Sequence, residues 1–315
     1  MLLNPIDLGD LMDTDLDTLA TALYARIDDT LKAHPELTPW RPKIGIEPKL
    51  SDAELLTLAA IQVLQGFNEE ARWIRYAQDH LRHLFPYVPG QAGYNKRLRK
   101  SAGQLEALIR LLGEDTDVWH DDVWLIDSTP VECSRSRPAA QRSNIAGWAG
   151  YGYCASHSRY FWGLRLHLVC TPTGLPVAFA LTNPKLDERD IALDIFDHDP
   201  RLLAGRHGQT IVGDKGYASN EFESRLAGHG VELLRPAKAR EKARRGGRQL
   251  KPIRQIIESV FDTLKGQLSL EDHHAHSQQG ILVRVLQRLL ALTVAIWHNE
   301  HSGAPVRRSL IAYDH

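Results

Sequence analysis

The stretch that decides the fold of this 315-residue chain is Arg254-Gln-Ile-Ile-Glu258-Ser-Val-Phe-Asp-Thr-Leu-Lys265. Its apolar residues recur at helical spacing and predict an amphipathic helix. Arg254, Glu258 and Lys265 fall in one stripe beside the apolar face, because each helical residue advances by about 100°. A carboxylate flanked by two cations suits a metal ion together with a phosphate. A solvated stripe of salt bridges is the alternative for this helix taken alone.

Two buried strands supply further carboxylates. Val123-Trp-Leu-Ile-Asp127 and Thr210-Ile-Val-Gly-Asp214 are apolar on both faces, as central strands are, and each ends in an aspartate. In an open α/β sheet the strand ends form the ligand crevice. Three carboxylates meeting there would need a cation to neutralise them. Oxygen ligands favour Mg²⁺ or Mn²⁺, so Asp127, Asp214 and Glu258 are candidate metal ligands.

The region from residue 119 to residue 300 alternates strand and helix patterns and predicts one α/β domain. Its fold class would be a mixed five-stranded sheet flanked by helices, with the last helix packed on the sheet. Residues 301–315 would form a tail. The expected strands cover 123–127, 160–171, 176–181, 210–214 and 231–234, and the expected helices cover 190–196, 220–227, 254–265 and 280–298.

Residues 1–118 predict an all-α N-terminal domain. Ser51-Asp-Ala-Glu54 is a capping box that opens a helix. One of the helices that follow carries Lys96, Arg97 and Arg99. This basic run predicts either a helix that contacts DNA or a solvated basic face.

The net charge of −1 does not by itself indicate a nucleic-acid binder, but the distribution of charge does. Residues 235–254 carry a local net charge of +8, and no Asp or Glu lies between Cys133 and Leu186. Segregated positive charge favours a polyanionic partner, although residues 238–251 could also be a flexible solvated loop. The candidate DNA contacts in these regions are Lys238, Arg240, Arg244, Arg245, Arg248, Lys251, Arg165 and His167.

Cysteine content and hydropathy predict a cytoplasmic protein with no membrane span. The three cysteines form no Cys-x-x-Cys pair, which fits a reducing compartment. The amino-terminal sequence is acidic and does not predict a secretory signal. The longest apolar candidate, residues 281–297, is interrupted by Arg284, Gln287 and Arg288.

Five motifs carry a resemblance to a known family. They are Asp127-Ser-Thr-Pro, Tyr151-Gly-Tyr, Tyr160-Phe-Trp-Gly-Leu-Arg-Leu-His167, Gly213-Asp-Lys-Gly-Tyr217 and Arg254-x3-Glu258-x6-Lys265. Over residues 50–298 the chain resembles a bacterial DDE transposase. It is most similar to the insertion-sequence family numbered 982, within the wider group related to insertion sequence four.

The resemblance implies an RNase H-like catalytic domain in which Asp127, Asp214 and Glu258 bind two Mg²⁺ or Mn²⁺ ions. It also implies that Arg254 and Lys265 contact DNA phosphate. The wider group usually has a tyrosine three residues before this arginine, where this chain has Lys251. That substitution allows a phosphate contact but not stacking on a flipped base.

The implied activity is cleavage of insertion-sequence ends and joining of the 3′-OH to target DNA. The expected partners are double-stranded DNA, as terminal inverted repeats and target, and a second copy of the chain in a homodimer on DNA. The expected location is the nucleoid.

Two other functions are consistent with the same residues. One is an RNase H-like nuclease without strand transfer, and the other is a catalytically silent regulator that binds DNA ends. His273, His274 and His276 raise the separate question of a zinc site. A polar loop is the favoured interpretation of these histidines, since no further ligand follows at zinc-site spacing.

Overall fold

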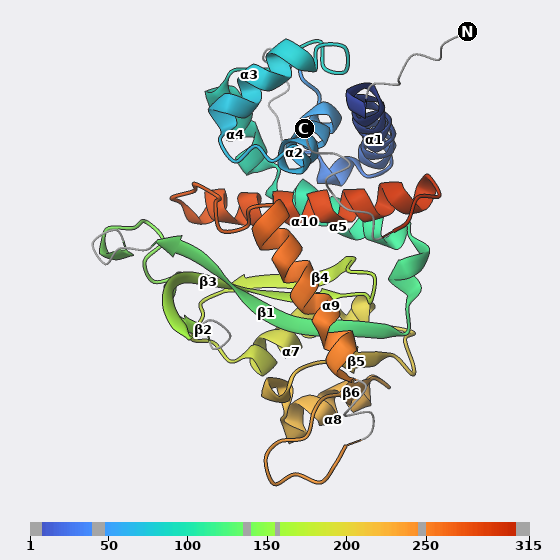
Figure 1. The fold of residues 1–315 in the computed structure, drawn as a ribbon, viewed down its shortest axis with the longest axis vertical. Coiled ribbons are helices and arrows are strands. Elements are labelled where there is room, and N and C mark those ends of the chain that lie inside the picture. Colours follow the sequence, from blue (N-terminus) through green and yellow to red (C-terminus); the bar gives the residue numbers. More distant parts are fainter. Residues whose placement is uncertain (1–7, 40–47, 135–139, 155–157, 245–249, 307–315) are drawn as a thin grey trace. The chain divides into compact units, whose positions relative to one another are not determined.

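The computed structural model describes residues 8–39, 48–134, 140–154, 158–244 and 250–306 (Figure 1). The chain divides into two compact units. The helical unit comprises residues 1–112, 266–275 and 279–315, and the sheet unit comprises residues 113–265 and 276–278. This division differs from the predicted domains 1–118, 119–300 and 301–315, because the C-terminal helix clusters with the N-terminal ones.

The sheet unit is built on a mixed six-stranded sheet. β1 pairs antiparallel with β3 and parallel with β5, and β6 extends the parallel side. β4 and β2 pair antiparallel with successive parts of the other edge of β3. The strands are β1 (Val123–Ser134), β2 (Gly150–Cys154), β3 (Arg159–Cys170), β4 (Pro176–Thr182), β5 (Thr210–Val212) and β6 (Glu232–Leu234).

The prediction of five strands was wrong, because β2 has no apolar pattern to indicate it. Its tyrosines, Tyr151 and Tyr153, are 47% and 48% exposed. A glycine is required at Gly152, where a Cβ would lie 2.7 Å from side-chain atoms of Phe161 and Pro184. The strand therefore depends on close packing against β3 rather than on a buried apolar face.

Three described α-helices cover this sheet. α7 packs against β3 and β4, α8 packs against β6, and α9 crosses β1 and β5 (Figure 1). The core-facing residues of α9 include Ile257, Val260 and Phe261, at the spacing that the sequence predicted. The bounds are α7 (Glu188–His198), α8 (Asn220–Gly228) and α9 (Leu250–Asp262), with short 3₁₀ segments η2 (Asp117–His120), η3 (Pro200–Leu202) and η4 (Lys215–Tyr217).

The predicted helix 254–265 does not continue in α geometry to its end. Residues Thr263–Gln267 form a π-helical turn that contains Lys265. A π turn advances the chain by less rotation per residue than an α turn. Lys265 therefore departs from the ideal stripe that it was predicted to share with Arg254 and Glu258.

All described secondary-structure elements of the helical unit are helices. The predicted capping box is present, since Glu54 N–H donates to Ser51 Oγ over 3.1 Å and Ser51 N–H donates to Glu54 Oε2 over 2.5 Å. The elements are α1 (Leu8–Ala33), η1 (Pro35–Leu37), α2 (Asp52–Leu64), α3 (Glu70–His80), α4 (Gln91–Lys100), α5 (Ala102–Glu114) and α10 (Gln278–His301).

α10 joins this unit through polar side chains that the sequence analysis treated only as interruptions of an apolar run. Arg284 forms a buried ion pair with Glu70, and Gln287 Nε2 donates to Ala59 O over 3.2 Å. Buried polar groups need such partners, and α2 and α3 supply them.

Of the helices described, α10 is long and apolar enough by composition to cross a membrane, but 89% of its most apolar window is buried inside the protein. A core helix passes the same test, so this is weak evidence for a span.

Candidate active site

Strand register brings Asp127 and Asp214 to the same level. β1 and β5 are parallel, with Leu125 opposite Val212, and each aspartate follows two residues later. The prediction that Asp127 ends its strand was wrong, because β1 continues to Ser134 by pairing with β3. Asp127 instead lies just beyond the last described pair with β5, where that edge of β1 becomes open.

Asp127 is a carboxyl group held in an unfavourable environment for its charge. Its pKa is raised to about 7, chiefly by burial and in addition by the carboxylates of Asp214 and Glu188. Two groups oppose this shift: the Ser128 N–H, which donates to Asp127 Oδ1 over 2.8 Å, and the Arg254 guanidinium. The site therefore favours an added proton or an added cation.

Asp214 follows β5 and caps the short segment η4. Its Oδ1 accepts the Gly216 N–H over 2.6 Å. A Cβ at Gly216 would lie 2.7 Å from that same oxygen, so only glycine allows the backbone to approach this closely. The sequence Gly213-Asp-Lys-Gly-Tyr217 thus fixes the direction of the aspartate.

Glu188 is an acidic residue of the site that the sequence analysis did not single out. It is the first residue of α7, and its Oε1 accepts the Ser128 hydroxyl over 2.7 Å and pairs with Arg165. Its neighbour Asp187 is the N-cap of α7 and accepts the Arg189 N–H over 2.9 Å. No periodicity distinguishes Glu188, because its proximity to Asp127 arises from tertiary packing.

A buried tyrosine lies near the carboxylates of the site. Tyr217 is fully buried, and its hydroxyl has no hydrogen-bond partner among the described residues. Burial raises its pKa well above the usual value, and Asp127, Glu188 and Asp214 add to the shift in that order. An orphan hydroxyl among carboxylate oxygens fits a site for a hard divalent cation. Within the described ranges, however, no three His, Cys, Asp or Glu side chains already form a metal-binding group.

Glu258, the predicted third carboxylate, lies on α9 and is exposed. Arg254, one turn before it, is near enough to Asp127 to lower the pKa of that carboxyl. α9 thus brings Arg254 close to Asp127.

A comparison with known families identifies the family of the chain. A family model described as "Transposase DDE domain" matches residues 119–294, which include all three predicted acids. The chain belongs to this transposase family. No curated protein matches the chain in sequence.

Among solved structures, one match is the cryo-EM structure of the piggyBac transposase synaptic complex with hairpin DNA. The identity is 9% and the TM-score is 0.41, over 98% of this chain and 79% of that chain. A likeness at this score does not establish a shared fold.

The predicted DNA contacts of this transposase in the basic loop are partly engaged within the protein. Arg244 binds Glu223 and Glu241, each over 2.9 Å, and Arg235 shares the same two carboxylates. Lys238 Nζ donates to a backbone carbonyl over 3.0 Å. Arg240 and Lys251 are exposed, while Arg245 and Arg248 lie outside the described residues.

Two predicted contacts on β3 point inward. Arg165 binds Glu188 and donates to Ser128 Oγ over 3.0 Å. His167 is 1% exposed and its Nε2 lies 3.1 Å from Thr182 Oγ1. Burial, followed by the charge of Arg165, lowers the pKa of His167 to about 4, so the ring is neutral at pH 7. Arg165 therefore contacts residues of the site, whereas His167 is buried against Thr182.

The basic helix α4 divides its cations between the interior and the surface. Lys96 and Arg99 are exposed. Arg97 pairs with Asp52 over 2.7 Å and donates to Leu50 O over 2.5 Å. Arg97 therefore fixes α4 to the start of α2 and is not available as a free surface charge.

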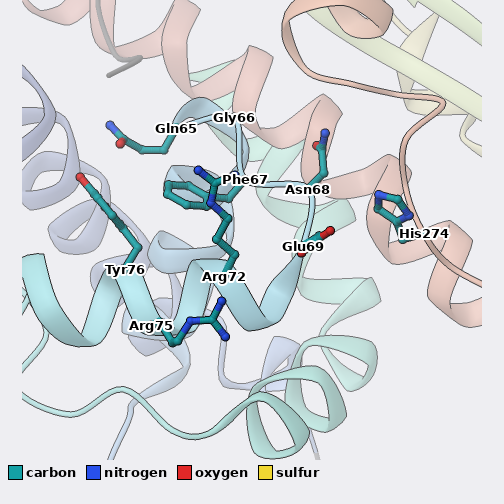
Figure 2. A pocket seen from close by; sticks show the side chains of 9 residues that line it. All are labelled: Gln65, Gly66, Phe67, Asn68, Glu69, Arg72, Arg75, Tyr76 and His274. Atoms are coloured by element: carbon teal, nitrogen blue, oxygen red, sulfur yellow. The ribbon is translucent and has the colours of Figure 1, made fainter.

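The helical unit contains a cavity of about 780 Å³ that the sequence analysis did not anticipate (Figure 2). The Arg72 guanidinium lies 5.7 Å from the Phe67 ring centroid. Neither Arg72 nor Arg75 has an ion-pair partner in the described part of the chain, so both rim cations are open to an anion. The lining residues are Gln65, Gly66, Phe67, Asn68, Glu69, Arg72, Arg75, Tyr76 and His274.

Proposed function

We propose that this chain is a DNA transposase that cleaves insertion-sequence ends and joins the freed 3′-OH to target DNA, using an RNase H-like catalytic domain. One observation carries the proposal: Asp127 and Asp214 lie at matching positions beside adjacent parallel strands, inside the segment that matches the transposase family. Carboxylates so placed are suited to metal-dependent phosphoryl transfer.

Asp127, Asp214 and Glu258 would hold two Mg²⁺ or Mn²⁺ ions. Such ions, when bound, supply Lewis-acid activation of the attacking oxygen and neutralise charge on the leaving oxygen. The buried carboxyl of Asp127 and the orphan hydroxyl of Tyr217 support a cation at this position. Glu258 is exposed on α9 and would join the aspartates when DNA and metal are bound.

The basic residues of the chain would position the strand rather than read its sequence. Arg254 lies beside Asp127 and is placed to bind the phosphate next to the scissile bond. Lys265, Arg240 and Lys251 would contact the backbone farther along. Positioning and charge stabilisation of this kind account for most of the catalysis in phosphoryl transfer.

We infer that the helical unit, which includes residues 1–112 of the predicted domain 1–118, binds DNA as well. Its exposed candidates are Lys96 and Arg99, together with Arg72 and Arg75 at the cavity (Figure 2). The partner DNA would carry terminal inverted repeats, and two ends would be paired by a homodimer. Assignment to the insertion-sequence family numbered 982 and a nucleoid location belong to the same proposal.

The catalytic proposal is tested with end-labelled DNA carrying the element's terminus and with a separate target duplex. Purified protein is incubated with Mg²⁺, Mn²⁺ or EDTA, beside Asp214→Asn and the exposed control Asp190→Asn. We expect metal-dependent cleavage at the element boundary and joined donor–target products, both absent in Asp214→Asn and retained in Asp190→Asn. Cleavage without joined products would support the nuclease alternative.

The exposure of Glu258 favours a second candidate, the silent regulator that binds DNA ends without chemistry. This function predicts tight end binding and no nicks in any metal. Metal-dependent nicking by the wild-type chain would exclude it.

The DNA role of the helical unit is tested through salt dependence. Each phosphate contact contributes about 0.9 to the slope of log K against log salt. Arg72→Gln with Arg75→Gln should reduce that slope by about 2, if each arginine binds one phosphate. Arg97→Gln is the internal comparison, because its guanidinium is already paired with Asp52. An unchanged slope in the double variant would remove the cavity from the DNA interface.

A further inference from the structure

We propose that Glu188 is an additional metal-site carboxylate, which reaches Asp127 and Asp214 from the first turn of α7. The proposal deepens the transposase function above and depends on it. It concerns an acid that lies outside the predicted triad of Asp127, Asp214 and Glu258.

Glu188 and Asp127 are connected through one intervening residue. Ser128 follows Asp127 in β1, and its backbone N–H donates to Asp127 Oδ1 over 2.8 Å. The hydroxyl of the same serine donates to Glu188 Oε1 over 2.7 Å. Ser128 thus binds both carboxylates and connects them at the open edge of β1.

Glu188 also approaches Asp214. A Cβ built on Gly216 would lie 2.7 Å from Asp214 Oδ1 and 3.6 Å from Glu188 Oε2. Both carboxylates therefore face the same glycine. Like charges brought this close destabilise one another unless a cation lies near them.

The ion pair with Arg165 involves only one of the two oxygens of the Glu188 carboxylate. Ser128 and Arg165 both bind Oε1. Among the described residues, Oε2 has no hydrogen-bond partner, and this is the oxygen that faces Gly216 and Asp214. A carboxylate with one oxygen anchored and the other facing Gly216 beside Asp214 is arranged as a ligand is, with its orientation fixed by neighbouring groups.

A neutral side chain at the same position also lacks a partner. The Tyr217 hydroxyl is fully buried beside Asp127, Glu188 and Asp214, and it lacks a partner in the part of the chain described. A buried hydroxyl without a hydrogen bond is costly, so this position calls for a missing polar group. A hydrated divalent cation held by Asp127, Asp214 and Glu188 Oε2 would provide one.

The test measures Mn²⁺ binding to the full chain without DNA, by electron paramagnetic resonance of the free ion. We expect Glu188→Gln to weaken Mn²⁺ binding by about tenfold or more, as loss of groups at metal sites does. The matched control is Asp190→Asn, an exposed acid in the same turn of α7, which should leave affinity within about twofold. Asp127→Asn tests the metal site itself and should weaken binding as well.

Arg165→Gln separates a ligand from a structural ion pair. If Glu188 served only to bind Arg165, this variant would weaken Mn²⁺ binding as Glu188→Gln does. If Glu188 is a ligand, loss of the competing cation leaves Mn²⁺ affinity unchanged or raises it. Circular dichroism of each variant shows whether the fold is retained.

A measurement on the wild-type chain needs no substitution. Fe²⁺ bound at the site generates hydroxyl radicals that cut nearby backbone, and we expect cuts next to Asp127, Glu188 and Asp214. Cuts at the two aspartates but not at Glu188, or normal Mn²⁺ binding in Glu188→Gln with weakened binding in Asp127→Asn, would overturn the role of Glu188 alone. Absence of Mn²⁺ binding in the wild-type chain would overturn the metal-dependent function as well.

Discussion

Asp127→Asn should stabilise the metal-free protein at neutral pH, because it removes a buried charge. The pKa of Asp127 is about 7 in the folded chain, and that of an unfolded aspartate is about 3.9. A carboxyl whose pKa is raised by folding contributes stability below its unfolded pKa and loses it as the pH rises through the folded pKa. The loss is complete above about pH 7 and amounts to about 4 kcal/mol, from about three pKa units at about 1.36 kcal/mol each.

The gain of Asp127→Asn over the wild type should therefore be near zero at pH 4 and about 4 kcal/mol at pH 8. The asparagine side-chain oxygen can still accept the Ser128 N–H, so that hydrogen bond is not lost with the charge. We would measure urea unfolding in EDTA from pH 4 to pH 8, following hydrogen exchange of β1 amides so that the sheet unit is reported. Asp190→Asn, an exposed acid, is the control and should show no such trend.

Equal stability of Asp127→Asn and wild type at pH 4 and pH 8 would refute the buried-charge argument. A second consequence follows for the wild type. At pH 6 about nine-tenths of the Asp127 carboxyls should be protonated, so Mg²⁺ or Mn²⁺ binding should release nearly one proton there and about a tenth of one at pH 8. Calorimetry in buffers with different ionisation enthalpies counts these protons, and a release independent of pH would contradict the assignment.

Three further predictions test other parts of the molecule. Glu258→Gln should abolish metal-dependent cleavage of labelled ends while end binding in a gel shift changes by less than about twofold, since the side chain is exposed and unpaired among the described residues. Gly163→Ala should unfold the sheet unit, because its Cβ would lie 2.1 Å from Val131 O. The control Gly103→Ala in α5, whose Cβ would have nothing within 4 Å, should raise the melting temperature. A folded Gly163→Ala variant would show that β1 and β3 can separate at this position. Arg284→Met should cost about 3–5 kcal/mol in urea unfolding by leaving the Glu70 carboxylate buried without its partner, and a cost below about 1 kcal/mol would show that water reaches the pair.

Local patterns were enough to predict most of the elements and both aspartates. The capping box at Ser51 and the apolar period of α9 are properties of neighbouring residues, so they can be recognised without a partner segment. The apolar runs before Asp127 and Asp214 indicate buried strands for the same reason. Both aspartates lie two residues beyond the pair of Leu125 on β1 with Val212 on β5.

Features that depend on tertiary packing were not predictable in this way. β2 is stabilised by close approach to β3 and carries exposed tyrosines where an apolar face was expected. α10 was assigned to the sheet domain because its apolar face suits either unit, and only the partners of Arg284 and Gln287 in α2 and α3 distinguish them.

Glu188 was missed because an acid in the first turn of a helix has a sufficient local explanation. Such residues interact favourably with the helix dipole and need no further role. Only the contacts of Glu188 with Ser128 and Arg165, and its approach to Gly216, show that it belongs to the site.

The balance of charge at the site connects these observations to function. Asp127, Glu188 and Asp214 approach one another, and the described cations that interact with them are Arg165 and Arg254. Two guanidinium groups cannot neutralise three carboxylates, and Asp127, whose pKa is raised to about 7, accordingly holds a proton near neutral pH. In the proposed function Asp127 would give up that proton to hold a metal ion, and Arg254 would exchange Asp127 for a DNA phosphate. The same exchange would draw Glu258 from the surface of α9 toward the aspartates, so metal binding and strand binding would assemble the site together.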